Sequence, residues 1–191
     1  MPTPSPQALE FLRARRSVPP KTMTGPAPTP SDLAPLLEAA LRVPDHGKLE
    51  PWRLVVIEKG AMGRLADLAE ARAQALGDAE KLAKARGQFD QGVLIVAVIS
   101  SPKPHPKVPV SEQQASAACV CLSLVNAALA SGWAAAWLTG WVSHDPEFSR
   151  AAFDLAEGET VAGLVHIGRE TSPVSDRPRP DVAALTRWVS A

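Results

Sequence analysis

Apolar side chains recur along the chain with two different spacings, one typical of helices and one typical of buried strands. The helical spacing is clearest after Thr29-Pro30-Ser31-Asp32, which resembles an acidic capping box. The apolar residues that follow fall at positions i, i+3, i+4, i+7 and i+8, and they are Leu33, Leu36, Leu37, Ala40 and Leu41. This pattern predicts an amphipathic helix with one face on the core.

The rest of the chain divides into further predicted helices, predicted strands and one irregular stretch. A first helix is predicted to open at Ser5-Pro6 and to end near Arg15-Arg16-Ser17. Further helices are predicted over residues 61–76, 78–86 and 111–131, from Asp145 onward, and at the C-terminal end. Strands are predicted over residues 52–58, 93–100, 134–140 and 160–168. Residues 18–30 are rich in Pro, Gly and Thr and are predicted to be irregular.

Strands alternate with helices, but they are too few and too unevenly spaced for a doubly wound sheet. We therefore predict an α+β fold, with a central mixed or antiparallel sheet of four or five strands flanked by helices, in one domain over residues 1–191. The helix predicted over residues 111–131 carries one charge, Glu112, and is apolar on every side. A helix that is apolar all round is buried all round, which in so small a domain predicts a homodimer with this helix at the interface.

Acidic and basic residues are equal in number, so the formal net charge is zero. This balance gives no bulk attraction to nucleic acid or to an anionic membrane. The N-terminal residues lack the apolar segment of a secretory signal, and the apolar residues 115–136 are interrupted by Ser116, Asn126 and Gly132. We therefore expect a cytoplasmic protein without a membrane span. Its two cysteines are interpreted as small apolar core residues.

Two basic clusters, one near each end of the chain, are candidates for a binding site. Arg15, Arg16 and Ser17 close the first helix, and Arg177 and Arg179 lie in a Pro-rich turn. Guanidinium groups are planar, permanently charged forks that match phosphate oxygens, so the two clusters are candidates for one phosphate clamp. The alternative is a solvated basic helix end, which the helix dipole favours.

Sequence motifs for nucleotide binding, nucleophilic catalysis and metal binding are absent from the chain. The chain contains neither G-x-G-x-x-G nor G-x-x-x-x-G-K-[ST], so side chains would have to bind any phosphate. It has no G-x-S-x-G motif and no tyrosine, and its four histidines lack the spacing of metal ligands. We therefore expect no metal and no catalytic side chain. The site that remains is one that binds an anionic, largely apolar cofactor, and that cofactor supplies the chemistry.

Four short motifs, in this order, resemble the FMN-dependent nitroreductase family and most closely its small YdjA-like branch. They are Arg15-Arg16-Ser17, then Pro44-Asp45-His46 with Glu50-Pro51-Trp52, then His105-Pro106-Lys107-Val108-Pro109 with Glu112-Gln113, and finally Ala136-Trp137-Leu138-Thr139-Gly140. The resemblance implies an obligate dimer with two FMN sites at the interface. It also implies a ping-pong reaction that passes a hydride from the co-substrate NAD(P)H through FMN to a nitro compound, a quinone or a similar small electron acceptor.

The resemblance further implies which residues bind the phosphate end of FMN. Arg15, Arg16 and Ser17 match positions that take up the phosphate and the ribityl chain. Arg177 or Arg179 would complete this clamp, as a C-terminal basic residue does elsewhere in the family.

A second set of matched positions concerns the flavin ring and the partner subunit. Leu138, Thr139 and Gly140 match a segment that runs along the ring, where backbone amides hydrogen-bond ring heteroatoms. Arg42 and His46 match positions that contact FMN from the neighbouring subunit.

Departures from the family pattern leave an alternative open. Glu50 replaces the usual Gln, Leu138 stands where the branch often has Arg, and Val110-Ser111 replaces a segment that contains an aromatic residue. The loss of a charge near the ring and the altered middle loop favour a non-catalytic flavin-binding or sensing dimer of the same fold. For Lys107 and Glu112 in the middle loop, the alternative to a functional role is a local ion pair without catalytic significance.

Overall fold

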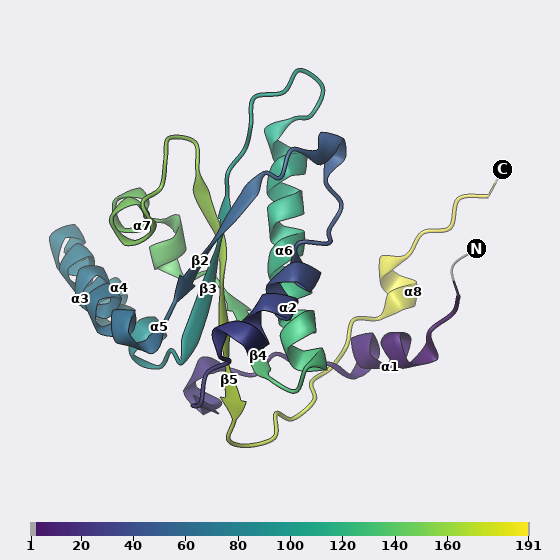
Figure 1. Cartoon of the computed structure of the whole chain (residues 1–191), viewed down its shortest axis with the longest axis horizontal. Coiled ribbons are helices and arrows are strands. Elements are labelled where there is room, and N and C mark those ends of the chain that lie inside the picture. The colour runs from purple at the N-terminus through teal and green to yellow at the C-terminus, as the bar shows by residue number, and fades with distance from the viewer. Residues whose placement is uncertain (1–2, 191) are drawn as a thin grey trace.

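The computed structural model describes residues 3–190, and its centre is a five-stranded sheet with helices on both faces (Figure 1). The strands are β1 (Met23–Thr24), β2 (Trp52–Ile57), β3 (Leu94–Ser100), β4 (Ala134–Leu138) and β5 (Thr160–Glu170). The helices are α1 (Pro6–Ala14), α2 (Pro30–Ala40), α3 (Lys59–Leu76), α4 (Ala79–Lys84), α5 (Gly87–Asp90), α6 (Val110–Ala130), α7 (Pro146–Phe153) and α8 (Val182–Leu185). Three 3-10 turns complete the description: η1 (Pro20–Thr22), η2 (His46–Lys48) and η3 (Trp141–His144).

The sheet is built around β5. The strand order is β1-β5-β3-β2, and β4 pairs with β5 as well. Every pairing within residues 3–190 is antiparallel, so of the two arrangements predicted, the antiparallel one is found and the mixed one is not. The two-residue strand β1 lies in the stretch that was predicted to be irregular, and only its pairing with the end of β5 defines it.

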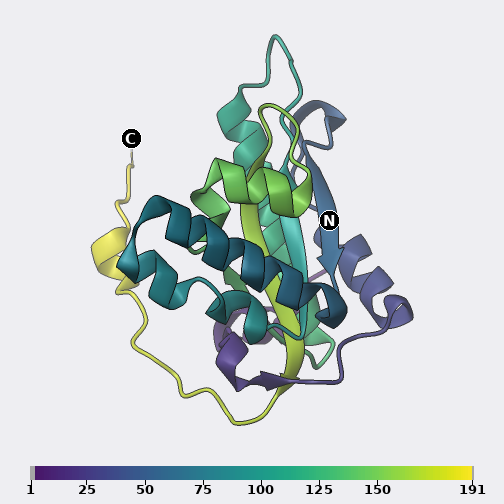
Figure 2. The same ribbon diagram turned by 90° about the vertical axis from the view of Figure 1, so that its left-hand side faces the viewer.

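Strand β3 is buried along its whole length, which explains its continuous apolar run. Val96 and Val98 join a core cluster with α2 and α6, whereas Ile95 and Ile99 join a second cluster with α3 and α7. Figure 2 shows α3 lying across the second face of the sheet. A helical layer on each face therefore encloses the central strands.

The predicted capping box at the start of α2 is confirmed. The Thr29 hydroxyl accepts a hydrogen bond from the backbone N–H of Asp32 at 3.2 Å, and the Asp32 carboxylate accepts one from the N–H of Thr29 at 3.0 Å. The helix buries Leu33, Leu36 and Ala40 in the cluster that it shares with α6. Local sequence and core packing thus favour the same helix.

The long apolar helix is confirmed as α6, and within a single chain only one side of it is buried. Val120, Cys121 and Leu124 are buried against the sheet, whereas Cys119 and Leu122 are exposed, Leu122 to 46%. The interpretation of the cysteines as core residues therefore holds for Cys121 alone. Within residues 3–190, α6 is also the one helix long and apolar enough to cross a membrane, but it packs against β3, β4 and β5 as a core helix does.

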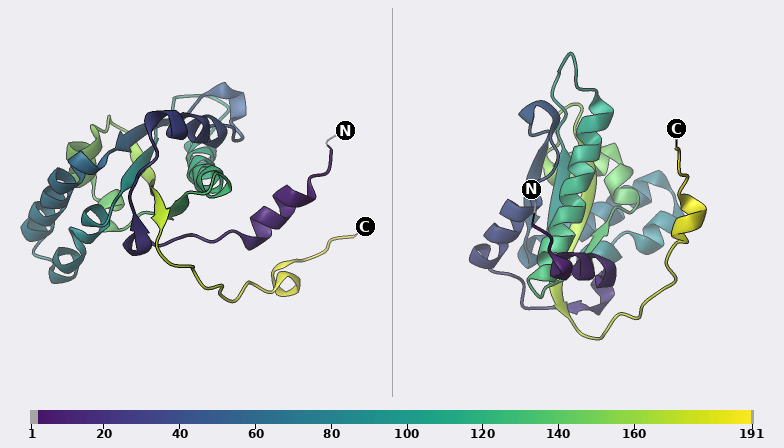
Figure 3. Two further views of the ribbon diagram at one scale, coloured as in Figure 1. Left: turned by 60° about the horizontal axis from the view of Figure 1, so that its bottom comes forward. Right: turned by 90° about the vertical axis from the view of Figure 1, so that its right-hand side faces the viewer.

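The two ends of the chain extend away from the sheet (Figure 3). Helix α1 has no buried residue, and its Leu9 and Leu12 are at least half exposed. The predicted C-terminal helix is reduced to the single turn of α8, because such a short helix is marginal without tertiary contacts. Trp188 beyond it is 90% exposed. Both ends therefore carry apolar side chains that have no packing partner within the described chain.

One polar side chain in the core leads to a prediction about stability. His166 on β5 is 1% exposed, and neither of its ring nitrogens has a hydrogen-bond partner among residues 3–190. Burial lowers the pKa of His166 from 6.5 to about 4. Between these two pH values the unfolded state binds a proton that the folded state does not, so lowering the pH favours unfolding.

We therefore predict that the free energy of unfolding falls as the pH is lowered from about 6.5 to about 4, with His166 contributing up to about 1.4 kcal/mol per pH unit. Chemical denaturation at several pH values measures this slope. His166→Leu should flatten it, whereas His144→Gln, at an exposed position, should leave it as in the wild type. An unchanged slope in His166→Leu would contradict the prediction.

Candidate functional site

The first basic cluster lies where the chain enters the core beside β4. The backbone N–H of Val18 donates to the carbonyl oxygen of Ala135 at 3.0 Å, and the Val18 side chain is buried. This bond holds Arg15, Arg16 and Ser17 next to the start of β4. The segment is therefore anchored to the sheet, although α1 before it is exposed.

The C-terminal turn meets this cluster, as predicted. The Arg16 guanidinium donates to the carbonyl of Ser175 at 2.7 Å and to the carboxylate of Asp176 at 2.8 Å. Arg179 donates to the same carboxylate oxygen at 2.9 Å. Within the described chain, Arg179 rather than Arg177 makes this contact. Two basic segments that lie far apart in the sequence therefore converge on one carboxylate.

The cluster carries an excess of positive charge. Partial burial, and next the nearby guanidinium groups of Arg179 and Arg16, lower the pKa of Arg15 below its usual value. One Arg15 terminal nitrogen donates to the Ser17 hydroxyl at 3.1 Å, while its enclosed Nε has no hydrogen-bond partner among residues 3–190. An anion bound here would relieve the mutual repulsion of the arginines. These residues therefore fit a phosphate group.

Leu138, Thr139 and Gly140 lie at the far end of β4 from this cluster. Thr139 lies four residue steps along the chain from Ala135, which corresponds to about 13 Å of extended strand. Gly140 has a φ of +66°, and a Cβ there would lie 2.8 Å from the Gln88 side-chain oxygen. Leu138 and Thr139 are partly exposed, so the backbone at this end of the strand is accessible. An elongated molecule with a phosphate at one end fits the spacing between cluster and strand end.

His46 and Arg42 are not brought to this cluster within one chain. The ring Nδ1 of His46 lies 2.8 Å from a carboxylate oxygen of Glu112, at the N-terminal end of α6. The arginine cluster lies near the other end of α6, beside the strand that follows it. The 21 residues of α6 span about 30 Å. Arg42 is exposed just beyond α2.

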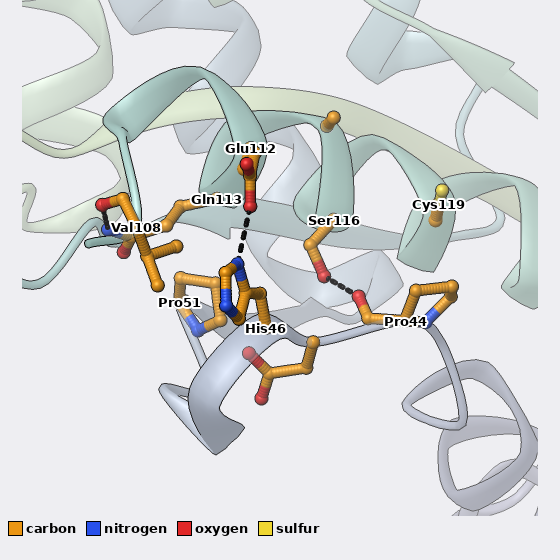
Figure 4. Close-up of a pocket in the computed structure, with 10 residues that line it drawn as sticks. Pro44, His46, Pro51, Val108, Glu112, Gln113, Ser116 and Cys119 are labelled. Carbon is orange, nitrogen blue, oxygen red and sulfur yellow. Dashed lines mark hydrogen bonds and ion pairs between the residues drawn. The ribbon is translucent and has the colours of Figure 1, made fainter.

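A pocket of about 230 Å³ lies beside His46 (Figure 4). It lies between the loop before β2 and the outer face of α6, and it is lined by Pro44, Asp45, His46, Pro51, Val108, Glu112, Gln113, Ala115, Ser116 and Cys119. Glu112 pairs with His46, and the alternative ion pair between Lys107 and Glu112 is not formed within residues 3–190. Only the fold brings Glu112 and His46 together.

The loop that carries His46 adopts a strained backbone. Lys48 and Glu50 have φ values of +54° and +48°, a conformation that is uncommon for residues other than glycine. The Asp45 carboxylate holds the loop by accepting hydrogen bonds from the N–H groups of Leu49 at 3.1 Å and Glu50 at 2.8 Å. The Glu50 side chain has no hydrogen bond or ion pair within residues 3–190. Its carboxylate is therefore not needed to hold the loop.

Three residues of the site were not among the predicted ones. Asp176 joins the two arginine segments, and Glu112 pairs with His46. The buried Gln113 amide accepts from the N–H of Lys103 at 2.8 Å and donates to its carbonyl at 2.9 Å, which shapes the middle loop. Glu112 stood out in the sequence as the single charge of an apolar helix but was given no role at the site, whereas nothing in the local sequence marked Asp176.

Fold and site together define a class of α+β protein, with an antiparallel sheet enclosed by helices and a cluster of arginines beside one strand. The description "Nitroreductase family" belongs to a family model that matches residues 12–169. The chain therefore belongs to the nitroreductase family, and the predicted resemblance is confirmed. The match ends before Asp176 and Arg179, so the C-terminal part of the cluster lies outside it.

Similar proteins support the same assignment. The chain is 35% identical over 162 residues to the Escherichia coli K12 protein "Putative NAD(P)H nitroreductase YdjA". The matched segment covers 84% of this chain and 87% of that protein. The chain is 38% identical over 165 residues, with the same coverage, to a Haemophilus influenzae protein described as "Putative NAD(P)H nitroreductase".

Solved structures confirm the predicted fold. A nitroreductase-like family protein from Bacillus cereus has a TM-score of 0.83 and 20% identity, with full coverage of both chains. A nitroreductase with bound FMN from Bacteroides fragilis has a TM-score of 0.74 and 21% identity, covering 97% of this chain and 100% of that one.

Proposed function

We propose that this protein is an FMN-dependent NAD(P)H oxidoreductase of the nitroreductase type, which passes a hydride from NAD(P)H to a nitro compound, a quinone or a similar acceptor. The observation that carries the proposal is the convergence of Arg15, Arg16 and Arg179 beside β4. The description of related proteins as NAD(P)H nitroreductases supports it. We further propose a cytoplasmic location and one domain over residues 1–191.

When bound, FMN supplies the hydride chemistry, and the protein binds and orients it. Arg15, Arg16, Ser17 and Arg179 bind the phosphate through charge-assisted hydrogen bonds. The backbone of 138–140 hydrogen-bonds the ring.

The second half of each site comes from a second copy of the chain. His46 lies about the length of α6 from the arginine cluster, so one chain does not bring His46 to that cluster. The apolar side chains exposed on α6, on α1 and at the C-terminal end offer the surface for such a homodimer. They include Leu122, Leu9, Leu12, Val182, Leu185 and Trp188. Figure 3 shows how far α1 and α8 extend from the sheet.

The visible spectrum of the purified protein tests the function. We predict flavin absorbance that bleaches when NAD(P)H is added without oxygen and returns when a quinone or nitro compound follows. Absorbance that never bleaches would instead support the non-catalytic flavin-binding dimer, for which Leu138 in place of the branch's Arg is the structural argument. A colourless protein that does not take up added FMN would contradict both.

The phosphate clamp is tested by alanine substitution. Arg15→Ala or Arg16→Ala should weaken FMN binding about 10- to 100-fold, because each loses a charge-assisted hydrogen bond to phosphate. Lys21→Ala is the control, because it removes the same charge at an exposed position of η1. Fluorescence titration of the apoprotein with FMN measures the three dissociation constants. Equal values would mean that the arginine cluster is a solvated helix end.

Mixing two defective chains tests the shared site. If Arg15 and His46 of one site come from different chains, a hybrid of Arg15→Ala and His46→Gln chains has one intact site and one doubly defective site. Co-expression of the two variants should therefore give about a quarter of the wild-type number of tight FMN sites. Each variant alone should give no site with the wild-type affinity for FMN. If the co-expressed protein has no more tight FMN sites than each variant alone, the shared site is contradicted.

A further inference from the structure

The pair formed by His46 and Glu112 fixes where one proton lies. The two side chains are 66 positions apart in the sequence, and His46 Nδ1 lies 2.8 Å from a Glu112 carboxylate oxygen (Figure 4). An ionised carboxylate only accepts hydrogen bonds, so Nδ1 carries the proton that is donated to Glu112. In the neutral ring, Nε2 is then left with a free lone pair.

The loop itself does not need this pair. On one side of His46, the Pro44 carbonyl accepts a hydrogen bond from the Ser116 hydroxyl of α6. On the other side, the Asp45 carboxylate holds the N–H groups of Leu49 and Glu50. The backbone at His46 is therefore attached to α6 and braced within the loop independently of Glu112. What Glu112 adds is the orientation and the tautomer of the imidazole ring.

Most other polar groups of the pocket already have protein partners. The Ser116 hydroxyl, the Gln113 amide and the Asp45 carboxylate are engaged in the hydrogen bonds described above. The rest of the lining is largely apolar, from Pro44, Pro51, Val108 and Ala115. Within the described chain, His46 Nε2 is therefore the ring atom left to recognise a polar group on a bound molecule.

We propose that Glu112 is a positioning residue for the cofactor site. It holds the His46 proton on Nδ1, so that Nε2 of the neutral ring accepts a hydrogen bond from an N–H or O–H group of bound FMN. This inference rests on the proposed function for the identity of the ligand. The pairing of the two side chains does not depend on it. Glu112 acts through His46 and does not itself touch the cofactor.

The tautomer of His46 is the first test. Long-range proton–nitrogen NMR spectra of the full chain at neutral pH distinguish the two neutral forms, and the chain has only four histidines to assign. In the wild type, the His46 proton should lie on Nδ1. Glu112→Ala should move it largely to Nε2, the form that a free imidazole side chain favours in water, whereas Glu157→Ala at an exposed loop position should not. An Nδ1 proton that persists in Glu112→Ala would overturn the proposal.

A double-mutant cycle on FMN affinity is the second test. Glu112→Ala and His46→Gln should each weaken FMN binding about tenfold, the effect of one lost hydrogen bond. The double variant should be no weaker than His46→Gln alone, because Glu112 has no ring left to position. Losses that multiply would mean that Glu112 supports the fold or binds FMN by another route. Failure of the wild type to bind FMN would reject the proposed function, while the tautomer measurement would still test the pair.

Discussion

The central strands β3 and β5 are buried on both faces, and the rest of the structure follows from this constraint. A strand apolar on both faces needs a layer of helices on each side, and α2 with α6 supplies one layer while α3 with α7 supplies the other. Because α6 lies along the sheet, its two ends are fixed relative to β4 and to the loop before β2. The two halves of the proposed site are attached at these ends.

Helix α6 therefore both separates and organises the site. Its N-terminal end holds His46 through Glu112 and the loop through Ser116, while the chain beyond its C-terminal end returns as β4 beside the arginine cluster. One face of the helix is used by the core and the other is left exposed. In the proposed dimer, the exposed face joins the halves that the helix keeps apart.

Local charge matters more than net charge in this protein. The chain is neutral overall, yet the guanidinium groups of Arg16 and Arg179 meet on Asp176, and partial burial together with these two groups lowers the pKa of Arg15. Asp176 offsets part of their repulsion, and its own pKa is lowered by the backbone N–H of Arg177 and by Arg16. A bound phosphate group would offset the repulsion among the arginines further, because it carries more negative charge and more acceptor oxygens than a carboxylate. Composition alone gives no indication of such a site.

Much of the fold was determined by local sequence, because helix periodicity, the capping box before Leu33 and the apolar run of β3 each act over a few neighbouring residues. That the C-terminal basic turn meets the Arg15–Ser17 segment was also predictable, since the family resemblance connects the two, but the choice of Arg179 over Arg177 was not. Tertiary structure alone decided that Glu112 pairs with His46 rather than with nearby Lys107, that Asp176 joins the arginines, and that one side of α6 stays exposed. These contacts join residues that are distant in the chain, and their distances depend on how the helices pack on the sheet, which no local pattern encodes.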